Sequence, residues 1–436
     1  MARGAADGGL RSATGLDCRA MSSELIAAVP QPARSPGAMA TIAGCICAAL
    51  CEGFDLQAAG VAAAGIAAEF APTPDQLGTF FSASTLGLFA GALLGGRVSD
   101  SFGRKRTLIG SIVLFGVFSI LTAACHDIQT LCWARLLTGA GLGGAFPNLL
   151  ALVSESSTPQ RRHANVALAY SGMPFGGAVV SLISMLSAPA HWRLIFIVGG
   201  VAPLLLAPVL QRLLRESAEF RHASEASAPA SAPLRRGSFT DILRSGRAVP
   251  SVLLWISSFL GLLVLYLILS WLPTLLVGNG FSKAEAAGVQ VAFNVGGGLA
   301  ALLIGQLLES RLRNPSIILS FLAVPVFVLL LASTPAVLGV VVSIVFGLGC
   351  AMLAAQGFLY ATAPRVYPTL IRGVGVGTAV AIGRVGSIVG PKLGGMLKAA
   401  GHGSSQLLMD ILPLVVLGSI AALAFAWRSA RRREAG

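Results

Sequence analysis

The stretch AALCEGFDLQAA, residues 48–59, places two carboxyl groups, Glu52 and Asp55, inside an otherwise apolar segment. Residues three apart share one face of a helix, so both carboxyls point the same way. One charge at the centre of a bilayer costs at least about 2.5–3.5 kcal/mol, so such residues usually face a cavity and serve a function. The stretch therefore predicts a membrane helix with a proton-handling site; carboxyls that only pair with a buried arginine are the structural alternative.

The rest of the chain is as apolar as this stretch. Of its 436 residues, 55% are hydrophobic and 11% are charged, whereas a soluble domain has about 25% charged residues. Apolar runs of about 20 residues predict an all-α membrane protein with twelve spanning helices, without the alternation of a membrane barrel. We expect the helices at 38–66, 76–97, 107–125, 130–153, 164–187, 192–213, 249–277, 285–308, 316–333, 335–360, 373–397 and 407–427.

The net charge of +13 follows a pattern that predicts topology. Of 31 Lys and Arg residues, 25 fall in the amino-terminal tail, 97–106, 161–162, 212–247, 311–313, 365–372 and 428–433. These segments are alternate loops and the two tails, so the positive-inside rule puts both termini in the cytoplasm. We expect a multi-pass protein of a bacterial inner (plasma) membrane, whose basic charge needs no nucleic-acid partner.

The helices divide six against six around a polar segment. We expect a disordered cytoplasmic tail at 1–35, a six-helix bundle at 36–213, a cytoplasmic linker at 214–248, a second six-helix bundle at 249–427 and a basic cytoplasmic tail at 428–436. The bundles are weakly self-similar at an offset of 209 residues, which maps Gly96, Asp100 and Arg104 onto Gly305, Glu309 and Arg313. Such a duplication predicts a pseudo-two-fold axis along the membrane normal and a midplane substrate site between the halves.

Small residues recur at every fourth position on several expected helices. The ridges are Gly87, Gly91 and Gly95; Gly172 and Gly176; Gly297, Ala301 and Gly305; and Gly386, Gly390 and Gly394. Such ridges let helix backbones approach closely, and we expect these smooth faces to rock against each other. The seven cysteines fall mostly within spans without a CxxC pair or metal spacing, so we expect no metal and no cofactor.

A buried arginine is expected beside the carboxyl pair. Asp55 lies about 26 Å along the first helix, and Arg135 about 8 Å into the fourth helix from the opposite end. Both therefore lie at similar depth in a core about 30 Å thick. Such an ion pair would keep one carboxylate ionised while the other could become neutral, and we favour Asp55 over Glu52 as the proton carrier.

A second buried arginine is a candidate substrate ligand. Arg384 lies about 17 Å into the eleventh helix, close to mid-membrane. A guanidinium binds a carboxylate bidentately, so we favour Arg384 as the anion ligand, with pairing inside the bundle as the alternative. Further candidate ligands are aromatic and polar residues within apolar spans, which could equally hold helices together: Phe146, Asn148, Tyr266, Asn294 and Gln356.

The loop GRVSDSFGRKR, residues 96–106, resembles the signature G-x-x-x-D-[RK]-x-G-R-[RK] of the major facilitator superfamily, with Ser101 in place of a base. The resemblance implies that Asp100 and Arg104 latch the cytoplasmic gate; the second-half copy at 309–313 is degenerate. RLLTGAG, residues 135–141, is similar to the R-x-x-x-G motif of proton-coupled members.

The segment 52–60 resembles the D/E-G-x-D motif of the aromatic acid:proton symporter family. Further agreement lies at 135–155, 173–178, 271–273 and 372–391, which extends the resemblance over nearly the whole chain outside the tail and linker. It implies uptake of an aromatic carboxylate with protons, and it assigns roles to Glu52, Asp55, Arg135, Glu155 and Arg384. With Arg161 and Arg372 from corresponding loops, Asp100, Arg104 and Glu155 are the gating candidates.

We therefore expect a monomeric, proton-coupled transporter, and not an enzyme, that imports a carboxylate of the 3-hydroxyphenylpropionate or hydroxybenzoate type by alternating access. Moving a monoanion into a negative interior opposes about 2.3 kcal/mol per 100 mV, and one co-transported proton makes the movement electroneutral. A drug or metabolite exporter of the same fold is one alternative. A polytopic membrane enzyme or sensor is another, although the sequence has no nucleophile–base pair or phosphate-cradling loop for it.

Overall fold

In the described part of the chain, twelve helices are each long and apolar enough to cross a membrane. The computed structural model describes residues 37–158, 160–187, 191–214, 216, 242–243 and 247–434. The expected tail at 1–35 and most of the expected linker therefore lie outside the described residues. The expected basic tail at 428–436 continues the last helix as far as Glu434.

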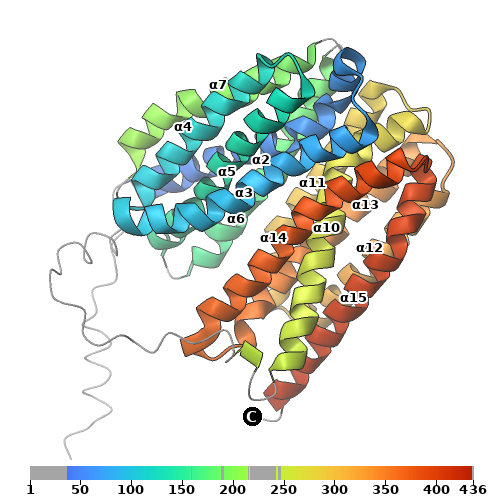
Figure 1. Ribbon diagram of the computed structural model, residues 1–436. Helices are drawn as coiled ribbons and strands as arrows, with labels where there is room; N and C mark the ends of the chain where they lie inside the picture. The colour runs from blue at the N-terminus through green and yellow to red at the C-terminus, as the bar shows by residue number, and fades with distance from the viewer. Residues whose placement is uncertain are drawn as a thin grey trace, which may run out of the picture.

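The helices gather into two lobes, one from each half of the chain (Figure 1). The first lobe holds α2 (Ala38–Phe70), α3 (Pro74–Phe102), α4 (Arg104–Ala123), α5 (Ile128–Ser156), α6 (Arg162–Leu186) and α7 (Trp192–Leu213). The second holds α10 (Ala248–Gly278), α11 (Lys283–Glu309), α12 (Arg313–Ser333), α13 (Leu338–Thr362), the short 3-10 helix η2 (Ala363–Arg365), α14 (Thr369–Ala399) and α15 (Ser404–Glu434). The all-α fold with twelve spanning helices is confirmed.

The internal repeat extends to the helix caps. Thr73 accepts a hydrogen bond from the backbone N–H of Gln76, whose side chain accepts one from the backbone N–H of Thr73. Ser282 and Glu285 form the same reciprocal capping box at the start of α11. Both pairs of residues are separated by the offset of 209, so the two halves start their second helix with the same device.

The glycine ridges lie inside the lobes rather than between them. A Cβ atom at Gly91 would lie 2.0 Å from the carbonyl oxygen of Ala140, which places the ridge of α3 directly on α5. A Cβ atom at Gly390 would similarly lie 2.1 Å from the carbonyl oxygen of Leu263, on α10 of the same lobe. The expectation that these ridges rock against each other is therefore wrong: they fix helices within each half.

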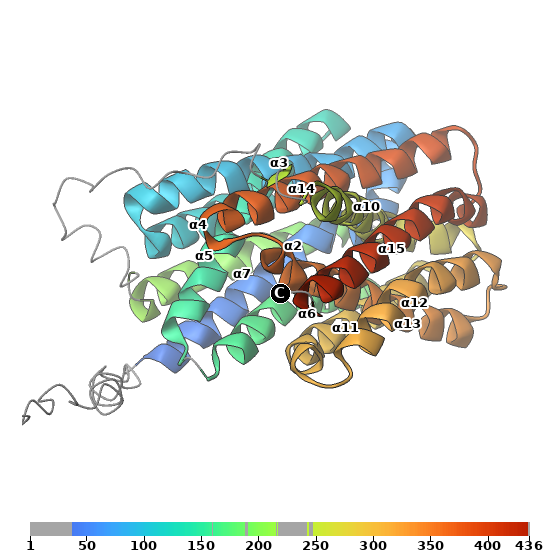
Figure 2. The same cartoon turned by 90° about the horizontal axis from the view of Figure 1, so that it is seen from below.

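The two lobes meet along α3 and α14, α6 and α11, and α2 and α10 (Figure 2). We call the end of the bundle where α2 begins and α15 ends the terminal face, and the other end the opposite face. The backbones of the two lobes approach each other closely toward the opposite face, where a Cβ at Gly78 would lie 3.0 Å from Gly395 and one at Gly60 2.7 Å from the carbonyl oxygen of Leu269. The lobes are therefore joined over the half of the bundle nearer the opposite face.

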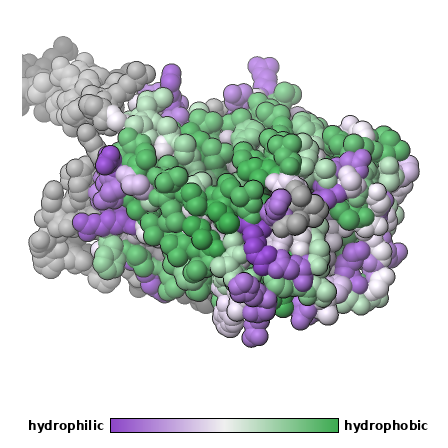
Figure 3. Space-filling view, turned by 90° about the horizontal axis from the view of Figure 1, so that it is seen from above, coloured by the Kyte–Doolittle hydropathy of each residue, from purple (hydrophilic) through white to green (hydrophobic). Residues whose placement is uncertain are grey.

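Apolar side chains also cover much of the outside of the bundle (Figure 3). Leu94, Leu205 and Leu319 each expose more than half of their surface. Apolar side chains turned outward on long helices are stable in lipid and costly in water. The surface therefore agrees with a protein that spans a bilayer.

Candidate functional site

An ion pair inside the first lobe fixes the second carboxyl of the opening stretch. Arg135 Nη1 donates to Asp55 Oδ2 at 2.9 Å, and neither side chain is exposed to solvent. Arg135 Nη2 donates to the backbone carbonyl of Asp55 at 2.9 Å and to Ser84 Oγ at 3.1 Å. The guanidinium lies 5.5 Å from the centre of the Phe196 ring. The contact expected from the depths of the two residues is thus formed.

The remaining oxygen of Asp55 has its own donor. Ser119 Oγ donates to Asp55 Oδ1 at 2.6 Å and lies 3.1 Å from the carbonyl oxygen of Phe196. Asp55 is therefore held by α4 and α5 together, with both oxygens satisfied. A carboxylate with two such donors is stabilised in its charged form and has little room to move.

Glu52, one helical turn away from Asp55, has no such hydrogen-bond donors among the described residues. It is 1% exposed, and neither of its carboxyl oxygens has a hydrogen-bond partner among the described residues. The positive charge of Arg384, from the other lobe, acts on it without a hydrogen bond between them. Between the two carboxyls lies Gly53, where a Cβ would lie 1.9 Å from the carbonyl oxygen of Met173, so α2 and α6 are in backbone contact here. The helix position of Glu52 is thereby fixed while its carboxyl is left unpaired.

Arg384 lies among tyrosines. Arg384 Nη1 donates to the hydroxyl of Tyr266 at 3.1 Å. Tyr170 and Tyr360 also lie within electrostatic range of the guanidinium, so the group draws on α6, α10, α13 and α14. The sequence indicated Arg384 and Tyr266 but did not single out Tyr360. A cation surrounded by phenol hydroxyls offers an anion one charge and several hydrogen-bond donors.

The other expected ligands divide between this group and elsewhere. Phe146 is half-buried with its ring 6.0 Å from that of Tyr170, and thus extends the tyrosine group. Asn148 is engaged within the first lobe, where it accepts a hydrogen bond from Ser99 at 2.6 Å and donates to the carbonyl oxygen of Gly144 at 2.9 Å. The structure therefore places Asn148 in a helix contact, which was the alternative considered for it.

Two amides expected as ligands are also placed. Asn294 exchanges two hydrogen bonds of 2.8 Å with Gln57, and Gln290 donates to the same Gln57 at 3.1 Å. These buried amides join α2 to α11 across the two lobes. Gln356 is buried and lines a small cavity between α10, α12, α13 and α15, one helical turn from Tyr360 on α13.

The gating candidates lie near the terminal face, and only some of them are brought together. Arg104 pairs with Glu155, which joins the start of α4 to the end of α5. Gly103 precedes Arg104 with a φ of 91°, a left-handed conformation that suits glycine. Asp100 and Arg161 are exposed. Arg372 is exposed too, and its Nε lies 3.5 Å from the carbonyl oxygen of Tyr367.

A further ion pair, which the sequence did not indicate, involves Lys392. Lys392 Nζ lies 2.7 Å from Asp75 Oδ1 and 2.8 Å from Thr79 Oγ1, and so joins α14 to α3 between the lobes. The depth argument that paired Asp55 with Arg135 could have found this contact. Lys392 lies about 35 Å along α14, near the opposite face where Asp75 begins α3.

Comparison with known proteins agrees with this architecture. The profile of the Major Facilitator Superfamily matches residues 45–433. The 3-(3-hydroxy-phenyl)propionate transporter of Escherichia coli (strain K12) is 42% identical over 393 residues, which cover 90% of this chain and 95% of that protein. The 4-hydroxybenzoate transporter PcaK of Pseudomonas putida is 31% identical and covers 87% of this chain and 90% of its own.

Solved structures of this fold are similar at lower identity. The D-xylose-proton symporter superposes with a TM-score of 0.72 at 17% identity, covering 88% of this chain and 96% of its own. A bacterial homologue of the human lysosomal transporter Spinster superposes with a TM-score of 0.71 at 16% identity, covering 92% and 98%. The chain therefore belongs to the Major Facilitator Superfamily and, within it, to the family that contains the aromatic acid transporters.

Proposed function

We propose that the protein imports a phenolic carboxylate together with protons, by alternating access between the two lobes. The observation that carries the proposal is an unpartnered buried carboxyl, Glu52, within electrostatic range of a partly buried cation, Arg384, that lies among tyrosine hydroxyls. The relatives named above are transporters of aromatic acids, which supports the substrate class. No observation favours export, or an enzyme or sensor.

The charge pattern supports an orientation. The terminal face bears the basic loops and both ends of the described chain, and the positive-inside rule assigns it to the cytoplasm. Because the lobes are in contact toward the opposite face, this conformation is the one in which the site would open to the cytoplasm. On the terminal face, Arg104 and Glu155 then stabilise the first lobe, while Asp100, Arg161 and Arg372 are free to contact the other lobe on closure.

The substrate carboxylate binds to Arg384 in this proposal. The guanidinium supplies the charge, while the hydroxyl of Tyr266 orients the guanidinium and can turn toward the anion. Arg384 and Tyr266 are largely removed from bulk water, which strengthens a charge-assisted hydrogen bond. Tyr170 and Phe146 offer aromatic surface to the ring of the substrate.

Glu52 carries the proton, in place of the Asp55 that the sequence favoured. A buried carboxyl without a donor is costly when ionised, and an arriving carboxylate at Arg384 would add a like charge. Glu52 therefore binds a proton from outside before or with the substrate and releases it to the cytoplasm. Asp55 keeps its hydrogen bonds with Arg135 and Ser119, so it is not the group that exchanges the proton.

The test separates these two carboxyls. In membrane vesicles, Glu52→Gln should abolish accumulation of labelled 3-(3-hydroxyphenyl)propionate or 4-hydroxybenzoate driven by a pH gradient. It should retain exchange of labelled for unlabelled substrate, because a permanently neutral side chain still permits substrate-loaded movement. Accumulation by Glu52→Gln that a protonophore abolishes would overturn the assignment. Efflux from loaded cells without any uptake would overturn import.

A further inference from the structure

Two lysines of the second lobe face the first lobe near the opposite face, in contrasting environments. Lys392 bridges to Asp75 and Thr79, with 37% of its side chain exposed. Lys283, at the start of α11, has a buried ammonium group with no hydrogen-bond partner among the described residues. Both positions lie where the lobes are closed in this conformation.

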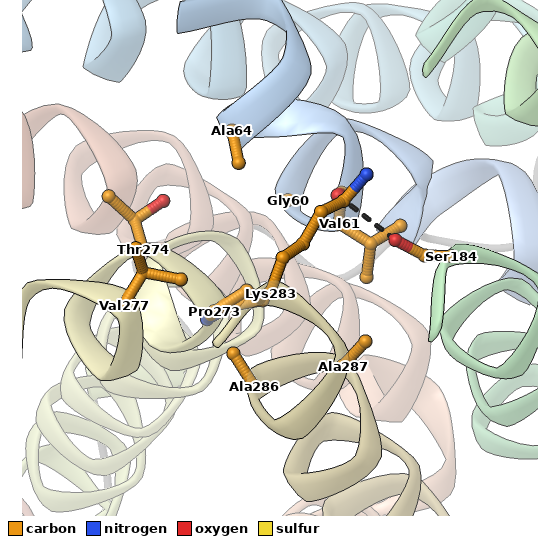
Figure 4. Close-up of a pocket in the computed structure, with 10 residues that line it drawn as sticks. All are labelled: Gly60, Val61, Ala64, Ser184, Pro273, Thr274, Val277, Lys283, Ala286 and Ala287. Carbon is orange, nitrogen blue, oxygen red and sulfur yellow. Dashed lines mark hydrogen bonds between the residues drawn. The ribbon is translucent and has the colours of Figure 1, made fainter. Parts of the chain in front are cut away.

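The surroundings of Lys283 come from both lobes. Its side chain points from α11 toward α2 into a small pocket, which Gly60 and Val61 line from the first lobe and Pro273 from the second (Figure 4). Thr274 Oγ1, which also lines this pocket, has no partner among the described residues either. The pocket leaves room for about one water molecule at most, so closure removes the ammonium group from bulk water.

The two lysines must respond differently when the lobes separate. Separation breaks the contacts of Lys392 with Asp75 and Thr79, which lie on the other lobe, so these contacts stabilise the closed state. Separation also hydrates Lys283, and an unpaired buried cation is less stable than a hydrated one. Burial of Lys283 therefore opposes the closed state.

We propose that Lys392 and Lys283 set the free energy of closing the opposite face in opposite directions. Lys392, through Asp75, favours closure, and Lys283 limits it. The balance matters for a transporter that loads from this side, because a closed state that is too stable would rarely reopen. This inference rests on the alternating-access part of the proposed function, and it needs no knowledge of the substrate.

The experiment measures how often the opposite face opens. Ser82 and Ser270 lie at two different contacts between the lobes. Ser82 of α3 donates to the carbonyl oxygen of Ile388 on α14, and Ser270 of α10 packs on Gly60 of α2. Each is replaced with Cys in the full chain, in a background lacking Cys125 and Cys132. Labelling by a membrane-impermeant maleimide is then followed in right-side-out vesicles. The conditions are chosen so that the labelling rate is proportional to the fraction of molecules whose opposite face is open.

Each lysine variant is combined with the thiol at the contact farther from that lysine, so that the lost charge does not alter the reactivity of the reporter thiol. With Ser270→Cys, Lys392→Met should speed labelling about two- to five-fold, the range that exposed ion pairs support, and Asp75→Asn should do the same. High salt should shrink this effect by screening the pair. With Ser82→Cys, Lys283→Met should slow labelling at least about five-fold, as expected for removing an unsatisfied buried polar group.

Shifts in the same direction for the two lysines, or no shift for Lys283→Met, would overturn the proposal. Lys392→Gln and Lys283→Gln, which are also neutral, replace any methionine variant that fails to reach the membrane. Because the labelling experiment needs no substrate, opposite changes in labelling rate for the two lysine variants support this proposal even if the uptake experiments identify another substrate or direction. Loss of uptake with unchanged labelling would leave the transport proposal intact and refute this one.

Discussion

Disrupting the Asp55–Arg135 pair should destabilise the protein strongly, and the effects of removing the two partners should not add. Asp55→Asn nearly keeps the side-chain volume but leaves a guanidinium with 0% exposure without its counter-ion. Removing one partner of a buried pair costs about 3–5 kcal/mol. At 1.36 kcal/mol per factor of ten, that lowers the folding equilibrium constant by about 150- to 5,000-fold.

Two further variants test whether loss of the ion pair causes the loss of stability. Glu52→Gln alters a neighbouring carboxyl on the same helix, but one without a hydrogen-bond partner among the described residues. We therefore expect it to change the free energy of unfolding by less than about 1 kcal/mol. The double variant Asp55→Asn/Arg135→Met removes both charges, so it should lose less stability than the sum of the single variants.

The assay is unfolding of the purified variants in one detergent, followed by intrinsic tryptophan fluorescence as temperature or denaturant rises. The expected order of stability is wild type close to Glu52→Gln, then the double variant, then Asp55→Asn. An additive double variant would refute the assigned pair. So would a Glu52→Gln variant that is as unstable as Asp55→Asn, because it would show that Glu52 has a structural partner.

Two further predictions concern packing and substrate binding. Gly91→Ala should sharply reduce the amount of folded protein, because its Cβ would lie 2.0 Å from the backbone of Ala140. Gly96→Ala on the same helix is the control: its Cβ would have no atom within 4 Å, so it should leave the amount of folded protein unchanged. Fluorescence-detected size exclusion measures both variants. Tyr266→Phe removes the 3.1 Å hydrogen bond with Arg384. A net hydrogen-bond contribution of about 0.5–1.5 kcal/mol should raise the apparent KM for uptake about two- to thirteen-fold. An unchanged KM, or equal behaviour of the two glycine variants, would contradict these assignments.

The sequence by itself determined the helices, their expected orientation and the repeat. These features depend on local composition: an apolar run long enough for the bilayer must close its backbone hydrogen bonds as a helix, and basic loops stay on one side. The offset of 209 residues held down to the caps at Thr73 and Ser282. Depth along a helix was also enough to pair Asp55 with Arg135, because a rise of 1.5 Å per residue is nearly constant.

Tertiary structure decided which of two carboxyls on one helical face is paired. Positions three apart differ by about 60° around the helix and 4.5 Å along it, and that difference directs Asp55 to α4 and α5 and Glu52 toward Arg384 of the other lobe. Packing likewise placed the glycine ridges inside the lobes and brought Lys392 to Asp75, 317 residues away in the chain. Local sequence fixes what a helix is and how deep each residue lies, but the angle at which helices pack decides which side chains meet.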